Sequence, residues 1–245
     1  MTDLKTTGLR TTGLEADYPK VSLIDADGRG YVWIGAEVDW RPPFLYGWMS
    51  RRKRRVLALM KSVKPKGAEV SVFRAWLVPP GRGRYLKDRP EVHVARYDAV
   101  LLLAFPTLAE ARDWIDGAEA FLSEIRAVSK RVDHHVLTNA RRIGPVDHDR
   151  DGIFLFNYFV ADDRDVNLAI WEHTAGWFQH ATGLDNSTLL IPEEASDYTV
   201  INHCRWDGPS DILPALIFRR DFRSFVLRSF ELNKTAATPV LYRLA

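Results

Sequence analysis

The two halves of this chain carry the same order of predicted elements, strand-helix-strand-strand-helix-strand, and this repeat limits the fold more than any other feature. In the second half, the aromatic and β-branched run IFLFNYFVA indicates a strand. Further strands are expected at 187–191, 198–206 and 239–244, with helices at 167–182 and 211–230. Asp162, Asp163 and Asp165 precede the first helix and Gly183 follows it, as is typical of helix ends.

The first half repeats this order with weaker signals. Its strands are expected at 31–40, 68–78 and 134–140, with one more that lies within 92–105 and ends in VLLLAF; its helices are expected at 44–63 and 106–129. The repeated order is that of a ferredoxin-like βαββαβ unit. We predict an α+β fold with two such units in tandem: a tail at 1–20, a first unit at 21–142, a linker at 143–152 rich in Gly, Pro and Asp, and a second unit at 153–245. A single domain of mixed topology is the alternative.

The strand at 198–206 indicates how the units are covered. One of its faces carries Tyr198, Val200, Asn202, Cys204 and Trp206, and the other carries Thr199, Ile201, His203 and Arg205. Neither face is purely apolar or purely polar, and both need cover. We therefore expect two sheets packed face to face as a dimeric-type α/β barrel. Its interior is expected to be a cavity suited to a flat hydrophobic ligand, unless side chains such as Phe154, Phe156, Trp76 and Phe159 fill it.

Composition excludes several classes of protein. The 245 residues are 46% hydrophobic and 27% charged, which is typical of a globular chain. No apolar run approaches the roughly 20 residues that span a bilayer, and the N-terminal residues do not resemble a signal peptide. The single cysteine, Cys204, excludes an internal disulfide framework and a multi-cysteine zinc site. We expect a cytoplasmic protein with no membrane partner.

Charge is distributed unevenly between the halves. Residues 1–143 carry 25 Lys and Arg against 17 Asp and Glu, a net charge of +8, whereas residues 144–245 carry 9 against 15, a net charge of −6. The halves are expected to attract each other. The basic run Arg51–Arg55 has no nucleic-acid-binding motif around it, so we expect a solvated helix segment that pairs with the acidic half, and no nucleic-acid partner.

The segment VINHCRWDGPSDI, from Val200 to Ile212, resembles a strand and helix of the antibiotic-biosynthesis monooxygenase family, which belongs to the dimeric α/β barrel superfamily. Asn202 and Trp206 occupy the family's Asn and Trp positions, and His203 replaces an aromatic residue. The resemblance covers about residues 153–244. In the first half, the segment YDAVLLLAFPTLAEARDW resembles a strand and helix of the same superfamily more distantly. When the two halves are aligned, Leu101 and Phe105 stand at the positions of Asn202 and Trp206. This implies one working site, in the second unit.

The tandem arrangement resembles oxygenases of aromatic polyketide pathways, including enzymes that open a ring of angucyclines. The resemblance implies O2 as co-substrate and either no cofactor or a reduced flavin (FMN or FAD). The basic turn at 81–84 could contact a flavin phosphate. Ile212 stands where some relatives carry a Tyr, so that proton donor is missing unless Tyr158, Tyr198 or Tyr242 replaces it from another strand. The predicted helix at 211–230 contains no His, which makes haem unlikely.

The resemblance and the residue chemistry together assign roles. Asn202 would stabilise an oxyanion, Trp206 would stack on the substrate, and His173 would act as base; His203 lies on the opposite strand face and is the weaker candidate. Aromatic contacts to the substrate are expected from Tyr158, Phe156, Tyr198, Trp177 and Trp76. No metal site is expected, because His134 and His135 point to opposite faces and His148 lies in the linker.

We therefore predict an enzyme, an oxygenase that hydroxylates or cleaves a polycyclic aromatic polyketide-type substrate with O2. The expected partners are a small aromatic substrate, O2 and a second copy of the chain in a homodimer. The alternative is a non-catalytic or cyclase-like barrel that binds a hydrophobic aromatic ligand.

Overall fold

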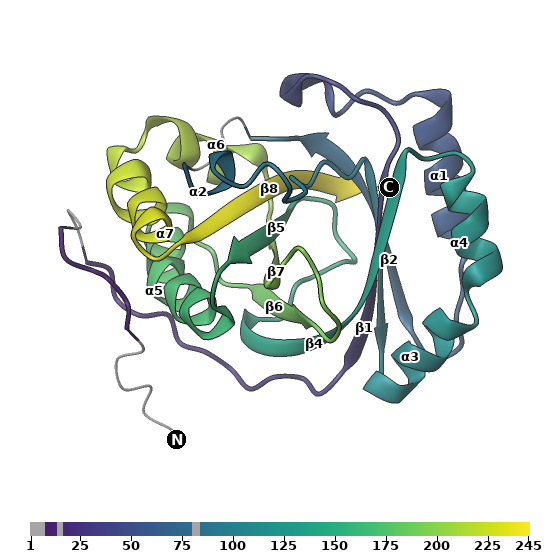
Figure 1. Cartoon of the computed structure of the whole chain (residues 1–245), viewed down its shortest axis with the longest axis horizontal. Helices are drawn as coiled ribbons and strands as arrows, with labels where there is room; N and C mark the ends of the chain where they lie inside the picture. The colour runs from purple at the N-terminus through teal and green to yellow at the C-terminus, as the bar shows by residue number, and fades with distance from the viewer. Residues whose placement is uncertain (1–7, 14–16, 80–83) are drawn as a thin grey trace.

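The strand periodicity builds a closed antiparallel barrel in the computed structural model, which describes residues 8–13, 17–79 and 84–245 (Figure 1). Its strands are β1 (Gly30–Glu37), β2 (Glu69–Leu77), β3 (Ala99–Phe105), β4 (Arg131–Gly144), β5 (Ile153–Ala161), β6 (Ser187–Pro192), β7 (Val200–Trp206) and β8 (Thr235–Leu244). Around the barrel the order is β1-β3-β2-β8-β5-β7-β6-β4.

This order contains the same sheet twice. The first half forms β4-β1-β3-β2 and the second half forms β8-β5-β7-β6, so corresponding strands occupy corresponding places. The two sheets join through antiparallel pairs, β2 with β8 and β4 with β6, and both pairs have irregular register. The predicted α+β fold, two ferredoxin-like units forming a dimeric-type α/β barrel, is confirmed.

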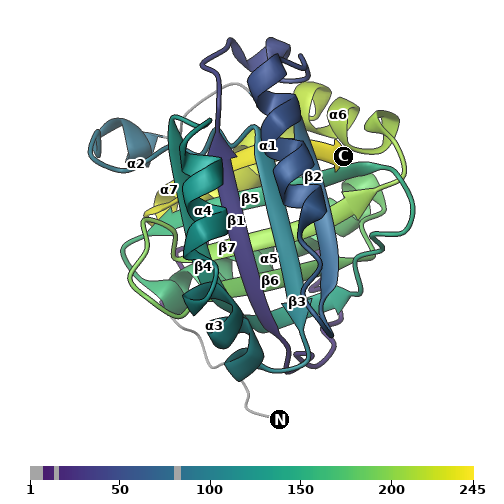
Figure 2. The ribbon, with the colours of Figure 1, turned by 90° about the vertical axis from the view of Figure 1, so that its right-hand side faces the viewer.

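Helices cover the outside of the barrel on two opposite sides. The first sheet is covered by α1 (Arg51–Ser62), α3 (Leu108–Asp116) and α4 (Glu119–Arg126), which Figure 2 shows in front of β1 and β3. The second sheet is covered by α5 (Arg164–Thr182), α6 (Pro209–Phe218), a π-helix (Phe222–Leu227) and α7 (Arg228–Leu232). A 3-10 helix (Pro43–Leu45) and a short helix, α2 (Arg84–Lys87), lie in connections.

The predicted end of α5 at Gly183 is confirmed, but the helix begins at Arg164, three residues before the predicted start. The Asp163 side chain accepts a hydrogen bond from the Val166 N–H at 3.0 Å, which caps the helix start. Gly183 ends the helix in the left-handed region, with φ of 69°, where a residue without Cβ avoids a steric penalty.

The three other long helices were predicted wrongly. The segment 44–63 becomes a 3-10 turn followed by α1, because Ser50 accepts from the Lys53 N–H and starts the helix there. The segment 106–129 divides at Gly117 into α3 and α4. The segment 211–230 divides at Arg219, whose backbone is extended, into α6 and the π-helix that precedes α7.

Strand ends differ where the two units pair. β4 was expected at 134–140 but reaches Gly144, inside the predicted linker, because it pairs with β6 of the other unit. β8 was expected at 239–244 but begins at Thr235, because it pairs with β5 along its whole first part. β1 ends at Glu37 instead of residue 40, whereas β3, at Ala99–Phe105, is the strand expected within 92–105.

The expected cavity inside the barrel is also wrong, because aromatic side chains fill this space. The interior core includes Trp33, Phe73, Phe154, Phe156, Tyr97, Tyr158 and Tyr242, all fully buried. Phe73 lies edge-on to both Phe154 and Phe156, with ring centroids 5.1 Å apart in each case. Two further cores lie outside the barrel, one beneath the helices of each unit.

Opposite charges do join the two halves, as their uneven distribution predicts. Arginines of the first half meet carboxylates of the second in four ion pairs: Arg89–Asp162, Arg112–Glu193, Arg131–Asp197 and Arg141–Glu172. The pairing expected for Arg51–Arg55 is wrong. In the described part of the chain Arg51, Arg52, Arg54 and Arg55 are exposed and have no ion pair, and Lys53 is buried.

The segment predicted as an N-terminal tail packs against the second unit where the structure describes it. The Tyr18 hydroxyl donates to the Asp221 carboxylate at 2.5 Å, and its ring lies against Phe225. Gly176 of α5 allows this contact, because a Cβ there would lie 2.1 Å from the Pro19 carbonyl oxygen. This segment therefore covers the outer face of α5.

Candidate functional site

A small cavity lies between the second sheet and α5, outside the barrel. Its walls are largely apolar, and its polar groups come from β5, β6, β7 and α5: Asn157, Ser187, Asn202, Cys204, Trp206 and Thr174. The lining side chains leave about 370 Å³ of unfilled space, but only about 20 Å³ of it admits a water molecule. That room corresponds to about one water.

Two carboxamides lie side by side on the floor of this cavity. Asn157 of β5 and Asn202 of β7 are direct partners in the antiparallel register, so their side chains share a face. Asn202 Oδ1 accepts from the Ser187 hydroxyl at 2.5 Å, which orients the amide. Its Nδ2 has only a weak contact with Cys204 Sγ, at 3.9 Å. A donor is therefore available to a bound oxygen atom.

Asn157 is the least satisfied polar group of the cavity. Its Oδ1 is buried without a hydrogen-bond partner among the described residues. An amide left unpaired in an apolar setting costs about 1–3 kcal/mol. A core position needs no amide there, whereas a site that binds a polar ligand does.

Asn157→Leu is expected to make the protein more stable. Leucine has nearly the same shape and removes the unpaired amide, so the free energy of unfolding should rise by about 1 kcal/mol. Urea denaturation measures this change. A fall in stability would show instead that the amide is satisfied in the folded protein and that Asn157 has a structural role.

Trp206 is part of the cavity wall, as the predicted site requires, but its N–H is already engaged. The indole Nε1 donates to the Thr182 hydroxyl at 3.0 Å, and that hydroxyl donates to the Phe178 carbonyl at 2.5 Å. Trp206 thus ties the end of α5 to β7. Its ring can contact a ligand, but its N–H is not free to donate to one.

His173 and Trp177, predicted as base and substrate contact, do not line this cavity. They share one face of α5, but that face points away from the sheet. His173 is half-buried against Phe225, and burial lowers the pKa of its imidazole. Trp177 is buried among Phe178 and Phe222.

The remaining predicted aromatic residues also lie elsewhere. Phe156, Tyr158 and Tyr198 belong to the barrel interior, and Trp76 packs at the outer core beneath Arg243. Tyr158 lies 3.2 Å from Tyr242, hydroxyl to hydroxyl. Of the predicted site residues, Asn202 and Trp206 line the cavity, whereas Phe156, Tyr158 and Tyr198 lie together inside the barrel.

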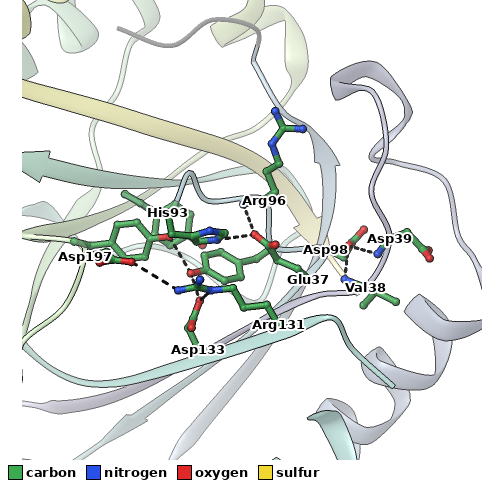
Figure 3. A network of polar contacts seen from close by, with 12 residues as sticks. Glu37, Val38, Asp39, His93, Arg96, Asp98, Arg131, Asp133 and Asp197 are labelled. Carbon is green, nitrogen blue, oxygen red and sulfur yellow. Dashed lines mark hydrogen bonds and ion pairs between the residues drawn. The ribbon is translucent and has the colours of Figure 1, made fainter. Parts of the chain in front are cut away.

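Tyr198 belongs instead to a polar network with Tyr97 and Asp133. Figure 3 shows Asp133 of this network beside Arg131 and Asp197. The Tyr198 hydroxyl lies 2.9 Å from that of Tyr97, which donates to the Asp133 carboxylate at 2.6 Å. Arg131 lies between Asp133 and Asp197, at 2.5 Å and 3.7 Å. Burial raises the pKa of Tyr198, so its phenol stays neutral.

No side chain that lines the cavity can act as a base near neutral pH. Its one titratable group is the Cys204 thiol, whose pKa is raised by burial. His203 lies on the opposite face of β7, as the strand alternation predicts, and stacks on Phe156 with ring centroids 4.1 Å apart. The cavity can therefore donate hydrogen bonds and has room for about one water, but its lining does not remove protons.

Asn157 is not among the predicted site residues, although with Trp206 it matches the strand Asn and Trp of the superfamily's haem-degrading branch and lies in the otherwise apolar or aromatic run IFLFNYFVA. An amide at the centre of an otherwise apolar strand was the available signal. Ser187 and Thr174 gave no signal of their own, because serine and threonine are common at such positions.

The cavity does not fit a flavin. It has no basic residue for the phosphate. The roughly 20 Å³ of the cavity that admits a water molecule is far below the several hundred Å³ of typical cofactor pockets. The basic turn at 81–84 lies outside the described residues. Within the described residues there is no group of three or more metal-ligating side chains, and no helix has the length and apolar character to cross a bilayer.

Comparison with known proteins shows the fold. No family model and no curated protein matches the chain. The structure is similar to that of an anthrone oxidase-like protein, with a TM-score of 0.65 and 9% identity over 91% of this chain and 94% of that one. A provisionally named monooxygenase from Fusobacterium nucleatum has a TM-score of 0.49 and 7% identity, over 88% and 92% of the two chains. A chlorite dismutase variant from Candidatus Nitrospira defluvii has a TM-score of 0.45 and 11% identity, over 91% and 93%.

Proposed function

We propose that this chain is an oxygenase that oxidises a phenolic aromatic substrate with O2 at the cavity beneath α5. The observation that carries the proposal is the Asn202 amide donor, whose only contact is a sulfur atom at 3.9 Å, in a largely apolar cavity. Beside it the unpaired Asn157 Oδ1 can accept a hydrogen bond from a substrate hydroxyl. Amide donors fixed in a water-poor site stabilise a developing oxygen anion without reorganising. The similarity to an anthrone oxidase-like protein supports the same class of reaction.

For an anthrone-type substrate the reaction is the conversion of a ring CH2 group and O2 into a carbonyl group and water. The substrate loses four electrons and O2 gains them, so no further reductant is needed. Because no base lines the cavity, the substrate must arrive as its phenolate or enolate anion. Asn202 Nδ2 would then donate to the oxygen that gains charge.

A fused-ring substrate needs more room than the cavity offers. Trp171, Phe178 and Phe230 form its apolar wall toward the helices, and Phe178 is only partly buried. Rotation of these side chains would join the unfilled space around them into one pocket. The reacting carbon would then face the two amides, with the rings between the sheet and α5.

The test is the conversion of anthrone to anthraquinone by the purified protein, with and without reduced flavin. The expected result is O2-dependent quinone formation above the buffer rate, without flavin, with oxygen from isotopically labelled O2 in the new carbonyl group. Quinone at the buffer rate with anthrone and its hydroxylated derivatives would reject the proposal.

A second candidate, a non-catalytic barrel that binds an aromatic ligand, is favoured by the absence of a base from the cavity. It predicts saturable binding of the same compounds, measured by quenching of tryptophan fluorescence, without turnover. Binding with quinone formation supports the oxygenase, and binding alone supports the carrier.

A further inference from the structure

The connection between β1 and α1 exposes four large apolar side chains. Trp40, Phe44 and Trp48 are 71%, 73% and 69% exposed, and Leu45 is 45% exposed. All four lie in the nine-residue segment 40–48, which we name the aromatic loop. Apolar residues gathered in this way mark an interaction surface, whereas singly exposed ones do not.

The aromatic loop is held in place from below. The Tyr46 side chain is buried, and its carbonyl oxygen accepts from Lys53 Nζ at 2.6 Å; the same ammonium donates to the Ala75 carbonyl at 2.9 Å. Arg41 donates to the Trp48 carbonyl at 2.8 Å and closes the loop. The fully buried Lys53 thus fixes the loop backbone to β2. A surface fixed in this way loses little conformational entropy when it binds.

Unpaired positive charge lies directly beside the aromatic loop. Arg51, Arg52, Arg54 and Arg55 are exposed on the first turns of α1 and have no ion pair in the described part of the chain. The first turn of this helix contains no acidic residue. Cations at a helix N-terminus oppose the helix dipole, so these arginines carry a cost that an external anion would offset.

We propose that the aromatic loop and the four arginines bind the surface of an anionic lipid bilayer. Tryptophan and phenylalanine side chains settle at the boundary between headgroups and acyl chains, and arginines beside them bind lipid phosphates. Figure 2 shows α6 at the same end of the molecule as the loop and the start of α1. The end of α6 exposes Ile217 and Phe218, 53% and 78%.

Charge favours a bilayer over a second copy of the chain. A twofold contact through this surface would bring the four arginines of each copy together. The expectation of no membrane partner rests on the absence of a spanning segment, which a peripheral contact does not need. A polycyclic aromatic compound also partitions into bilayers, so this surface would place the protein near such molecules.

The test is sedimentation of the full-length protein with vesicles of phosphatidylcholine alone or mixed in equal parts with phosphatidylglycerol. We expect binding to the anionic vesicles, weakened by salt, with a blue shift of tryptophan emission, and little binding to phosphatidylcholine. Arg51→Glu with Arg54→Glu should reduce partitioning at least tenfold. Acidic residues favour a helix N-terminus, so this variant should keep its thermal stability.

Two further variants separate the contributions of charge and apolar contact. Lys61→Glu with Lys64→Glu makes the same charge change at the other end of α1 and should alter partitioning less than twofold. Trp40→Ser with Trp48→Ser should lose the blue shift and most of the binding. Equal partitioning of wild type and the Arg51/Arg54 variant would overturn the proposal. So would a dimer that the Trp40/Trp48 variant disrupts, or binding of a single-stranded oligonucleotide but not of vesicles.

Discussion

Asn202→Leu is expected to lower kcat/KM for anthrone oxidation at least a hundredfold. Loss of one donor that stabilises an oxyanion typically costs about 2.7–4 kcal/mol in the transition state. The Ser187 hydroxyl orients the Asn202 amide through its Oδ1, and the Nδ2 donor has only a weak contact with the Cys204 sulfur. Replacement of Asn202 therefore removes the best-placed N–H donor of the cavity. Initial rates of quinone formation at several substrate concentrations measure the change.

The matched control for Asn202→Leu is Ile201→Leu. Ile201 precedes Asn202 on β7 but points into the barrel interior, and the exchange conserves volume. We expect Ile201→Leu to keep kcat/KM within about threefold of wild type, because such a swap usually costs under about 1.5 kcal/mol of stability and leaves the cavity unchanged. A comparable loss of activity in both variants, or no loss in Asn202→Leu, would place the chemistry elsewhere.

Asn157 and Asn202 should differ in what they do to stability. Asn157 is unpaired, so its replacement by leucine should stabilise the protein while it impairs oxidation. Asn202 is bonded to Ser187, so its replacement leaves that hydroxyl with only a 3.4 Å contact to the His203 carbonyl. If Asn157→Leu is more stable and Asn202→Leu is less stable than wild type, while both oxidise anthrone more slowly, the loss of activity does not come from a loss of stability.

The fold could be predicted because strand periodicity and connection order act locally. The run 153–161 has Asn157 among apolar and aromatic residues, and the run 200–206 has Asn202, His203 and Arg205 among apolar ones. These patterns are sufficient to place the strands. The extension of β4 to Gly144 and of β8 back to Thr235 could not be predicted, because these ends are stabilised by pairing with strands far away in the sequence.

The site could be predicted only in part for a similar reason. Alternation along β7 correctly groups Asn202 with Trp206 and separates them from His203. Helical spacing correctly groups His173 with Trp177, but spacing alone does not say which face of α5 meets the sheet. That choice depends on the segment around Pro19 and on the π-helix, which together cover the face with His173.

The cavity was expected inside the barrel and lies outside it because both faces of the second sheet are buried. The interior face carries enough aromatic volume to fill the barrel, so the unfilled space remains beneath α5, where small side chains such as Thr174 and Ala175 meet the amides. The filled interior also buries histidines, and this has a measurable consequence for stability.

Stability is expected to fall steeply as the pH drops from about 6 to about 4. Burial lowers the pKa of His135 and of His148 to about 4 and lowers that of His203 well below its usual value. His148 Nε2 lies 2.8 Å from His203 Nε2, and His203 Nδ1 lies 3.2 Å from the Leu155 carbonyl oxygen. Because that carbonyl only accepts, neutral His203 donates through Nδ1 and accepts from His148, and this arrangement has no place for an added proton between the two rings.

The sign follows from proton uptake. In the unfolded chain these imidazoles have pKa values of about 6.5, so below that pH the unfolded state binds more protons than the folded state. The stabilisation is fully present above about 6.5 and is lost as the pH falls toward the folded-state values. Three such groups give a slope of about 4 kcal/mol per pH unit at its steepest. Urea denaturation at a series of pH values measures it.

The contribution of one imidazole can be isolated on β4. His135 stacks on Trp33 with ring centroids 5.7 Å apart, so phenylalanine can replace it. His135→Phe should reduce the slope by about one third, since one of three proton-binding groups is lost. An unchanged slope in His135→Phe would mean that this imidazole is protonated in the folded protein, which would contradict burial as the cause of its lowered pKa.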